Sequence, residues 1–151
     1  MQELNERAKN AAEKLIKDVV SDGWDDRKKA DAIHDYLAKI CEYDEEFAPV
    51  SYTALGALEY GKAVCEGYSA AFNLLCRAAG VRSLAVSNST HMWNAVLTDG
   101  VVYHYDATHD DIGETALDTY RGIPDGELSD QNHEGYNLPD KKYFSMQEFE
   151  K

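Results

Sequence analysis

Apolar residues recur at helical spacing in the first part of the chain. Over residues 4–19 they return every three or four positions, and the Ser-Asp-Gly sequence that follows is a signal for the end of a helix. A second amphipathic stretch begins after Asp25, a residue type that caps helices, and places Ile33, Leu37 and Cys41 on one face. The pattern predicts two helices, with Cys41 in the core.

The middle of the chain combines helical segments with runs typical of strands. A short helical segment is predicted over 53–60, and a longer helix opens at Val64–Tyr68. The predicted strands are 81–86, 91–97 and 101–106. Asp99-Gly100, a strong short signal for a β-hairpin, separates the last two. Helices followed by antiparallel strands predict an α+β fold, in which the longer helix packs on a small antiparallel sheet.

The segment 112–151 lacks a sustained hydrophobic period and is rich in Gly, Asp, Asn and Pro. It is predicted to be an irregular tail, with a short strand or turn over 142–148. Its aromatic side chains are expected to pack back onto the core: Tyr120, Tyr136, Tyr143, Phe144 and Phe149. We predict one domain over residues 1–151, a length that suffices for a single hydrophobic core.

Charge narrows the classes of partner. The chain has 15 Lys and Arg residues against 28 Asp and Glu, a formal net charge of −13. Repulsion from phosphate groups argues against nucleic acid and anionic membranes. An acidic surface could favour basic peptides, but a soluble surface that repels its own copies is the simpler interpretation. The N-terminus lacks the features of a signal peptide, and no run is apolar enough to span a membrane. We therefore expect a soluble chain, either cytoplasmic or excised from a secreted protein.

The three cysteines, Cys41, Cys65 and Cys76, are odd in number and have no CxxC spacing. They predict neither a zinc site nor a complete disulfide framework, so at least one thiol is expected to be free. No metal or cofactor is expected. A free thiol indicates a reducing compartment or a thiol retained for chemistry.

Cys65 lies at the predicted start of a helix, where unpaired N–H groups and the helix dipole stabilise a thiolate. Gly67 would let a substrate backbone approach closely, which makes it a candidate for the substrate cleft. The alternative is that Cys65 is a small buried residue where helix and sheet meet. Further candidate residues are needed to decide between the two.

The predicted hairpin brings His91 and Asp106 onto one face of the sheet. With Asp99 and Gly100 as the loop, Trp93 lies opposite Asp106, and His91 is its diagonal neighbour. A carboxylate within hydrogen-bond reach of an imidazole fixes its tautomer and supports its protonated form. The hairpin therefore predicts a base and its orienting acid, but not the distance from either to the cysteine.

Three blocks contain these residues: Val64-Cys65-Glu66-Gly67-Tyr68-Ser69, His91-Met92-Trp93-Asn94-Ala95-Val96 and Tyr103-His104-Tyr105-Asp106-Ala107-Thr108. They resemble the blocks V-C-x-G-Y, H-x-W-N-x-V and W-Y-x-x-D-x-T of the bacterial transglutaminase-like domain, in the same order. With weaker similarity upstream, the resemblance covers about residues 30–111. Two positions depart from the family: His109 replaces a usual tryptophan and Val102 an aromatic residue, which affects the expected acyl-donor pocket.

The resemblance implies a papain-related fold and a triad of Cys65, His91 and Asp106. In such an enzyme the Cys65 N–H and a second donor hold the oxyanion. Tyr52 is our candidate for the second donor, and the alternative is a buried aromatic that anchors its loop. Trp93 is expected either to form a wall of the substrate cleft or to serve the core.

Relatives with this triad transfer an acyl group to an amine or hydrolyse amide bonds, and both reactions begin with a thioester. The resemblance therefore implies an enzyme that acts on protein or peptide substrates, either a transglutaminase-like acyltransferase or a hydrolase such as a cysteine protease or amidase. The main alternative is a non-catalytic module that binds peptide or glycan. A third hypothesis is a metal site without a recognised ligand motif, built from His104, Asp106, His109, Asp110 and Asp111.

Overall fold

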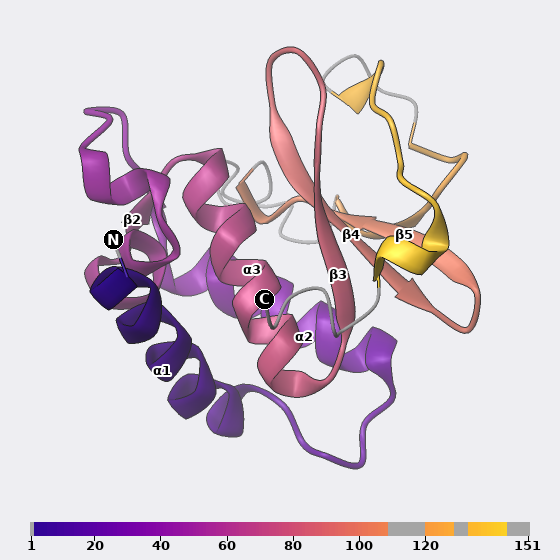
Figure 1. The fold of residues 1–151 in the computed structure, drawn as a ribbon. Coiled ribbons are helices and arrows are strands. Elements are labelled where there is room, and N and C mark those ends of the chain that lie inside the picture. The colour runs from indigo at the N-terminus through magenta and orange to yellow at the C-terminus, as the bar shows by residue number, and fades with distance from the viewer. Residues whose placement is uncertain (1, 109–119, 129–132, 145–151) are drawn as a thin grey trace.

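Helices form one side of the molecule and a β-sheet the other (Figure 1). The structure, a computed structural model, describes residues 2–108, 120–128 and 133–144. Its α-helices are α1 (Gln2–Val19), α2 (Asp26–Ile40) and α3 (Cys65–Ala79). They confirm the helices predicted from hydrophobic spacing.

Local sequence signals explain where these helices begin and what they bury. Asp25 Oδ1 accepts a hydrogen bond from the Lys28 amide at 2.8 Å and so caps α2. The apolar face of α1, which includes Ala12 and Ile16, packs against α3. Cys41 directly follows α2 and is 1% exposed, which confirms its predicted place in the core.

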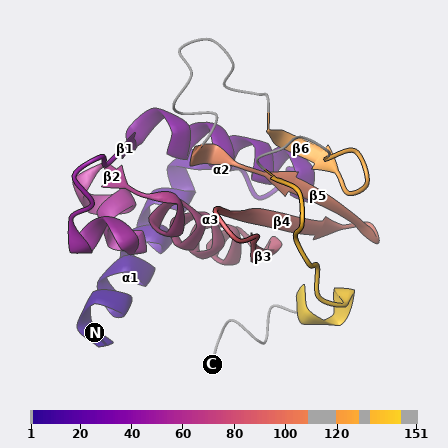
Figure 2. The same cartoon turned by 90° about the horizontal axis from the view of Figure 1, so that it is seen from above.

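The main sheet is antiparallel, in the order β3-β4-β5-β6. Its strands are β3 (Arg82–Ser87), β4 (Met92–Thr98), β5 (Val101–Tyr105) and β6 (Arg121–Pro124). Both α2 and α3 contact this sheet, and Figure 2 shows them on the same side of it. The arrangement confirms the α+β class, with α3 packed on a small antiparallel sheet.

Shorter elements join α2 to α3. They are β1 (Glu42–Tyr43), the 3-10 helix η1 (Pro49–Tyr52), the π-helix η2 (Gly56–Tyr60) and β2 (Lys62–Ala63). The strands β1 and β2 pair in parallel, which returns the chain to the start of α3. The short helical segment predicted over 53–60 is thus found mainly as η2.

The β4–β5 hairpin has the predicted register. Thr98 lies opposite Val101, and Asn94 lies opposite Tyr105. Asp99 and Gly100 both have positive φ, 51° and 76°, as a type I′ turn requires. The same register carries the chain beyond β5 directly to Asp106.

The two faces of the sheet differ in what covers them. Val96 and Tyr105 belong to the apolar core shared with the helices. On the opposite face, Trp93 packs in a second cluster with Phe144 from the C-terminal part of the chain. That part is also more regular than predicted, because β6 extends the sheet and Lys141–Phe144 forms a 3-10 helix, η4. Both elements are only four residues long, too short to show a period in the sequence.

Of the expected tail aromatics, Phe144 is fully buried and Tyr136 packs on Trp93, whereas Tyr143 is 44% exposed. Phe149 lies outside the described residues. Within the described ranges, none of the helices combines the length and the apolar character that a membrane crossing requires.

Candidate active site

Cys65 is the first residue of α3, as predicted. Val64 precedes it in an extended conformation and makes no side-chain cap, so the first-turn N–H groups lack the usual capping acceptor. The thiol is partly exposed, and its Sγ lies 3.6 Å from Glu66 Oε1. Partial exposure at the positive end of a helix is the setting of a reactive cysteine rather than a structural one.

The loop that faces this helix end is held by the carboxylate of Asp44. Its oxygens accept hydrogen bonds from the amides of Glu46 and Ala48 and from the Ser51 hydroxyl at 2.7 Å. These bonds, led by that of Ser51, lower the pKa of Asp44. The backbone carbonyl of Ser51 accepts a hydrogen bond from the Val64 amide at 2.9 Å. This bond attaches the loop to the residue that precedes Cys65.

Gly67 does not line a cleft, contrary to our sequence-based hypothesis. It is buried, and a Cβ at this position would lie 2.3 Å from the Ser51 carbonyl oxygen and 3.0 Å from that of Thr53. The absent side chain therefore admits the protein's own loop against α3, and not a substrate. Sequence alone could not distinguish these two reasons for a glycine.

Tyr52 lies next to the residue that is fastened to Val64, and it is 43% exposed. This exposure excludes the alternative of a buried anchor. The neighbouring Ser51 is hydrogen-bonded to Val64, the residue before Cys65, and Tyr52 stays our candidate for the second donor.

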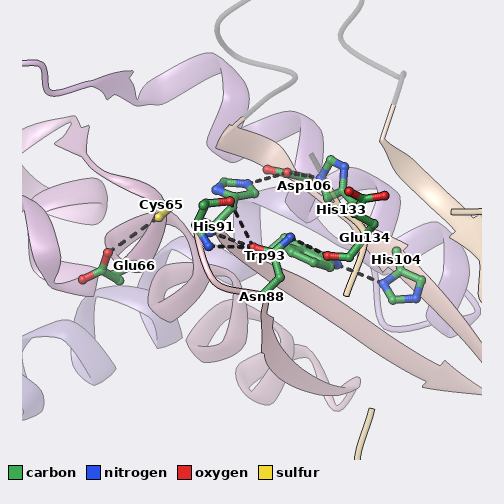
Figure 3. Close-up of polar contacts among 10 residues, drawn as sticks. Cys65, Glu66, Asn88, His91, Trp93, His104, Asp106, His133 and Glu134 are labelled. Atoms are coloured by element: carbon green, nitrogen blue, oxygen red, sulfur yellow. Dashed lines mark hydrogen bonds and ion pairs between the residues drawn. The ribbon is translucent and has the colours of Figure 1, made fainter. Parts of the chain in front are cut away.

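His91 lies between Cys65 and Asp106 (Figure 3). Its Nε2 is 2.7 Å from Asp106 Oδ2, which is the contact predicted from the hairpin. Burial opposes protonation of His91, but hydrogen bonds and charge from Asp106 and Cys65 outweigh it and raise its pKa to about 9. Because Nε2 faces Asp106, Nδ1 is the nitrogen available to the thiol. The arrangement favours the protonated form of His91 at neutral pH.

An irregularity in the sheet helps to place Asp106. The β5–β6 register shifts between His104 and Tyr105, and Gly122, with φ of 73°, is the extra residue on β6. Beyond this bulge the Asp106 amide donates to the Tyr120 carbonyl at 2.9 Å. Backbone from the C-terminal part of the chain thus fixes the carboxylate that holds His91.

His133 is a member of this site that sequence analysis missed. Its side chain is fully buried, and its Nε2 lies 2.6 Å from Asp106 Oδ2, the same oxygen that His91 contacts. It comes from a segment without hydrophobic period, so no local pattern marked it. The ligand atoms of His91, Asp106 and His133 lie within 4.8 Å of one another, so this trio, and not the predicted five, is the described group that could hold a metal.

The predicted metal-site residues are divided. His104 is bound to Trp93 and Asp125, while His109, Asp110 and Asp111 lie outside the described residues. The metal hypothesis based on that set therefore has no support from the described part of the chain.

Trp93 lies behind His91 and does not form an open wall. It is 1% exposed, and its ring stacks on the imidazole of His91 with centroids 5.8 Å apart. Its Nε1 donates to His104 Nδ1 at 3.0 Å. Of the two roles expected for Trp93, burial supports the core role, through which it supports the back of the histidine.

His104 and Asp125 form a second histidine–aspartate pair on this face. His104 Nε2 lies 2.9 Å from Asp125 Oδ1, which also accepts the Tyr136 hydroxyl at 2.6 Å. Burial lowers the pKa of His104 despite the nearby carboxylate. No sequence block pointed to Asp125 or Tyr136, because both lie in the segment predicted to be irregular.

Comparison with known families identifies the superfamily of the chain. The sequence model of the transglutaminase-like superfamily matches residues 13–109, and the chain belongs to this superfamily. The match begins earlier than the resemblance of the sequence motifs, which starts near residue 30. His133 and Asp125 both lie beyond it.

Curated relatives are distant and much longer. The kyphoscoliosis peptidases of Homo sapiens and Mus musculus are each 26% identical to this chain, over 67% and 66% of its length. The matched region spans only 18% of either relative. Together with the superfamily match, the similarity to a peptidase indicates a cysteine enzyme in general terms.

Two solved structures share the fold. A crystal structure of a TGase matches with a TM-score of 0.56 and 22% identity, over 72% of this chain and 33% of that one. A proposed cysteine protease from Cytophaga hutchinsonii matches with a TM-score of 0.56 and 17% identity, over 77% of this chain and 41% of that one. At these identities the comparison establishes the fold.

Proposed function

We propose that the chain catalyses cysteine-dependent acyl transfer or hydrolysis at amide bonds of protein or peptide substrates. The observation that carries the proposal is the position of His91, with Asp106 at 2.7 Å on one side and Cys65 on the other, and the resulting rise of its pKa to about 9. A thiolate–imidazolium pair is the activated state of a cysteine nucleophile.

In the proposed first step, the Cys65 thiol gives its proton to Nδ1 of His91. The thiolate attacks the carbonyl carbon of the amide, and the carbonyl π electrons move to the oxygen. The intermediate collapses when the C–N bond breaks and the imidazolium returns its proton to the leaving nitrogen. A thioester at Cys65 remains, with His91 neutral and Asp106 still ionised.

In the second step, His91 removes a proton from water or from a primary amine as that nucleophile attacks the thioester. The C–S bond then breaks, and the departing sulfur of Cys65 takes the proton back from His91. The product is a carboxylic acid when water attacks and a new amide when an amine attacks. Hydrolysis and acyl transfer to an amine share every step up to the thioester. Access of water or amine to the thioester then decides the product.

Negative charge on the carbonyl oxygen needs hydrogen-bond donors in both steps. The Cys65 amide is one candidate, because it lies in the first turn of α3, where helix amides have no intrahelical acceptor. The exposed hydroxyl of Tyr52 is the second. Its exposed position next to Ser51 supports this assignment.

Mass spectrometry of a glutamine-containing peptide library, with and without a primary amine, tests the proposal. An amine adduct indicates transglutamination, the small mass increase of deamidation indicates hydrolysis of a side-chain amide, and cleavage indicates a protease. Cys65→Ser should lower any such turnover by roughly 10⁴-fold or more, as expected when a nucleophile is lost.

Cys76→Ala is the matched control for this experiment. Cys76 lies on the same helix but is fully buried, and burial raises the pKa of its thiol, so its removal should leave turnover near wild type. Unchanged turnover in Cys65→Ser would place the chemistry elsewhere. No product with the wild-type chain and the library would contradict the enzyme proposal and favour a peptide-binding module.

A further inference from the structure

We infer that His133 is a positioning residue for Asp106, and that the active site is therefore completed by a segment outside the superfamily core. This inference rests on the proposed function, because it assigns a role in orienting the proposed triad. His133 lies beyond the matched residues 13–109, yet its Nε2 contacts Asp106 Oδ2 at 2.6 Å. The contact places a second imidazole on the carboxylate that holds His91.

The chemistry of the contact assigns the protons. One oxygen of Asp106 lies 2.7 Å from His91 Nε2 and 2.6 Å from His133 Nε2, and both are hydrogen-bond distances. An ionised carboxylate only accepts, so each Nε2 must carry a proton and donate it. A neutral His133 with its proton on Nε2 satisfies this requirement. Its donation favours the ionised form of Asp106 and restricts rotation of the carboxylate.

The surroundings of His133 hold it rigidly in this role. Its ring meets Trp93 edge-on with centroids 4.7 Å apart and packs on Tyr120 with centroids 4.5 Å apart. Trp93 also stacks on His91, and the backbone carbonyl of Tyr120 accepts a hydrogen bond from the Asp106 amide. Trp93 and Tyr120 therefore fix the position of His133 relative to both His91 and Asp106.

Asn88 fastens the two chain segments to each other. Its side-chain oxygen accepts the His91 amide at 2.9 Å, and its side-chain nitrogen donates to the carbonyl of Glu134 at 3.0 Å (Figure 3). The residue after His133 is therefore linked through one side chain to the backbone of His91. A C-terminal segment that only covered the sheet would not need a hydrogen-bonded link to the backbone of His91. The link is expected if this segment completes the active site.

A metal ion bridging the same three groups is the competing explanation. Binding would require both Nε2 atoms to lose their protons, whereas their close approach to one carboxylate oxygen is that of two N–H donors. Elemental analysis of the purified protein separates the two explanations. Stoichiometric zinc that is lost in His133→Gln would overturn the positioning role, and metal-free active protein supports it.

Two variants that differ by one methylene test the donor itself. The amide nitrogen of glutamine can take the place of His133 Nε2, whereas that of asparagine falls short of Asp106. We expect His133→Gln to keep kcat near wild type and His133→Asn to lower it roughly 10- to 100-fold with little change in KM, as for loss of a hydrogen bond to a charged group. Tyr136→Phe, which removes a hydrogen bond of the tail to Asp125, should leave kcat near wild type.

Two readouts do not depend on a substrate. Alkylation of Cys65 by iodoacetamide at neutral pH should slow in His133→Asn and not in His133→Gln. Imidazole ¹H–¹⁵N NMR of the wild-type protein should show His133 protonated on Nε2. If these patterns hold while no peptide is turned over, the positioning role stands and the proposed reaction fails.

Besides the zinc result, three outcomes would overturn the inference. One is wild-type alkylation and kcat in His133→Asn. Another is an equal loss in both variants while circular dichroism shows them folded, because packing and not donation would then be responsible. The third is wild-type His133 protonated on Nδ1 alone, a measurement that decides the matter even if a variant does not fold.

Discussion

Two histidine–aspartate pairs lie on the same face of the sheet, and Trp93 connects them. His91 contacts Asp106 at 2.7 Å, and His104 contacts Asp125 at 2.9 Å. The Trp93 ring stacks on the first imidazole and donates its N–H to the second. Despite this similarity, the pKa of His91 is raised to about 9, whereas that of His104 is lowered.

The third partner of each histidine explains the difference. An indole N–H can only donate, so His104 Nδ1 must accept, and the imidazole stays neutral with its proton directed to Asp125. His91 instead has the thiol of Cys65 in place of the indole, and a thiolate there stabilises a second proton on the ring. A histidine–aspartate pair becomes a candidate catalytic pair through what occupies the remaining nitrogen.

The largest expected contrast is in the two aspartates. Asp106→Asn should lower turnover about 10³- to 10⁴-fold, because an amide does not stabilise the imidazolium and can select the wrong tautomer of His91. Asp125→Asn should leave turnover near wild type, because its amide oxygen can still accept from His104. Steady-state kinetics on the same peptide measures both, and comparable losses would show that the pairs act as one unit.

The contacts within the first pair were predictable because a two-residue turn fixes the register of a hairpin. Asp99 and Gly100 set that register, and side-chain alternation then brought His91 and Asp106 onto one face. The approach of Cys65 to His91 was not predictable in this way. It depends on how α3 packs on the sheet, which only the family resemblance implied.

The second pair and His133 were beyond sequence reasoning for a physical reason. Asp125 and His133 follow a β-bulge at Gly122 and come from stretches too short to show a hydrophobic period. Gly67 illustrates the opposite difficulty. Its motif position was recognised, but its purpose is close contact with the Ser51 backbone, which only three-dimensional packing reveals.

A smaller effect is expected on the free energy of unfolding when the second pair, His104 and Asp125, is changed. His104→Leu leaves the buried Trp93 N–H without its acceptor, and we expect it to lower the free energy of unfolding by about 1–3 kcal/mol. Urea unfolding measures the change. In a Trp93→Phe, His104→Leu double variant the unsatisfied N–H is absent, so the two losses should not add, with a coupling of roughly 0.5–3 kcal/mol. Additive losses would mean that the indole–imidazole bond contributes little.

Titration of both imidazoles in one sample tests the contrast most directly. By NMR, His91 should lose its proton with a midpoint near pH 9, whereas the midpoint of His104 should lie below 6.5. Cys65→Ser should lower the midpoint of His91, because a serine hydroxyl hydrogen-bonds but does not ionise and so removes the charge of Cys65, and it should not move the midpoint of His104. A His91 midpoint at or below 6.5 in the wild-type protein would contradict the imidazolium assignment.

The same shifts should affect stability with opposite signs. Because the pKa of His91 is raised from 6.5 to about 9, its contribution is complete below pH 6.5 and is lost as the pH rises through about 9. Because the pKa of His104 is lowered, its contribution is present above pH 6.5 and is lost as the pH falls through its folded-state value. In pH-dependent urea unfolding, His91→Gln should therefore flatten the alkaline limb and His104→Leu the acidic limb. If either variant flattened both limbs, the two imidazoles would titrate as one coupled system through Trp93, and the division into a charged pair and a neutral pair would fail.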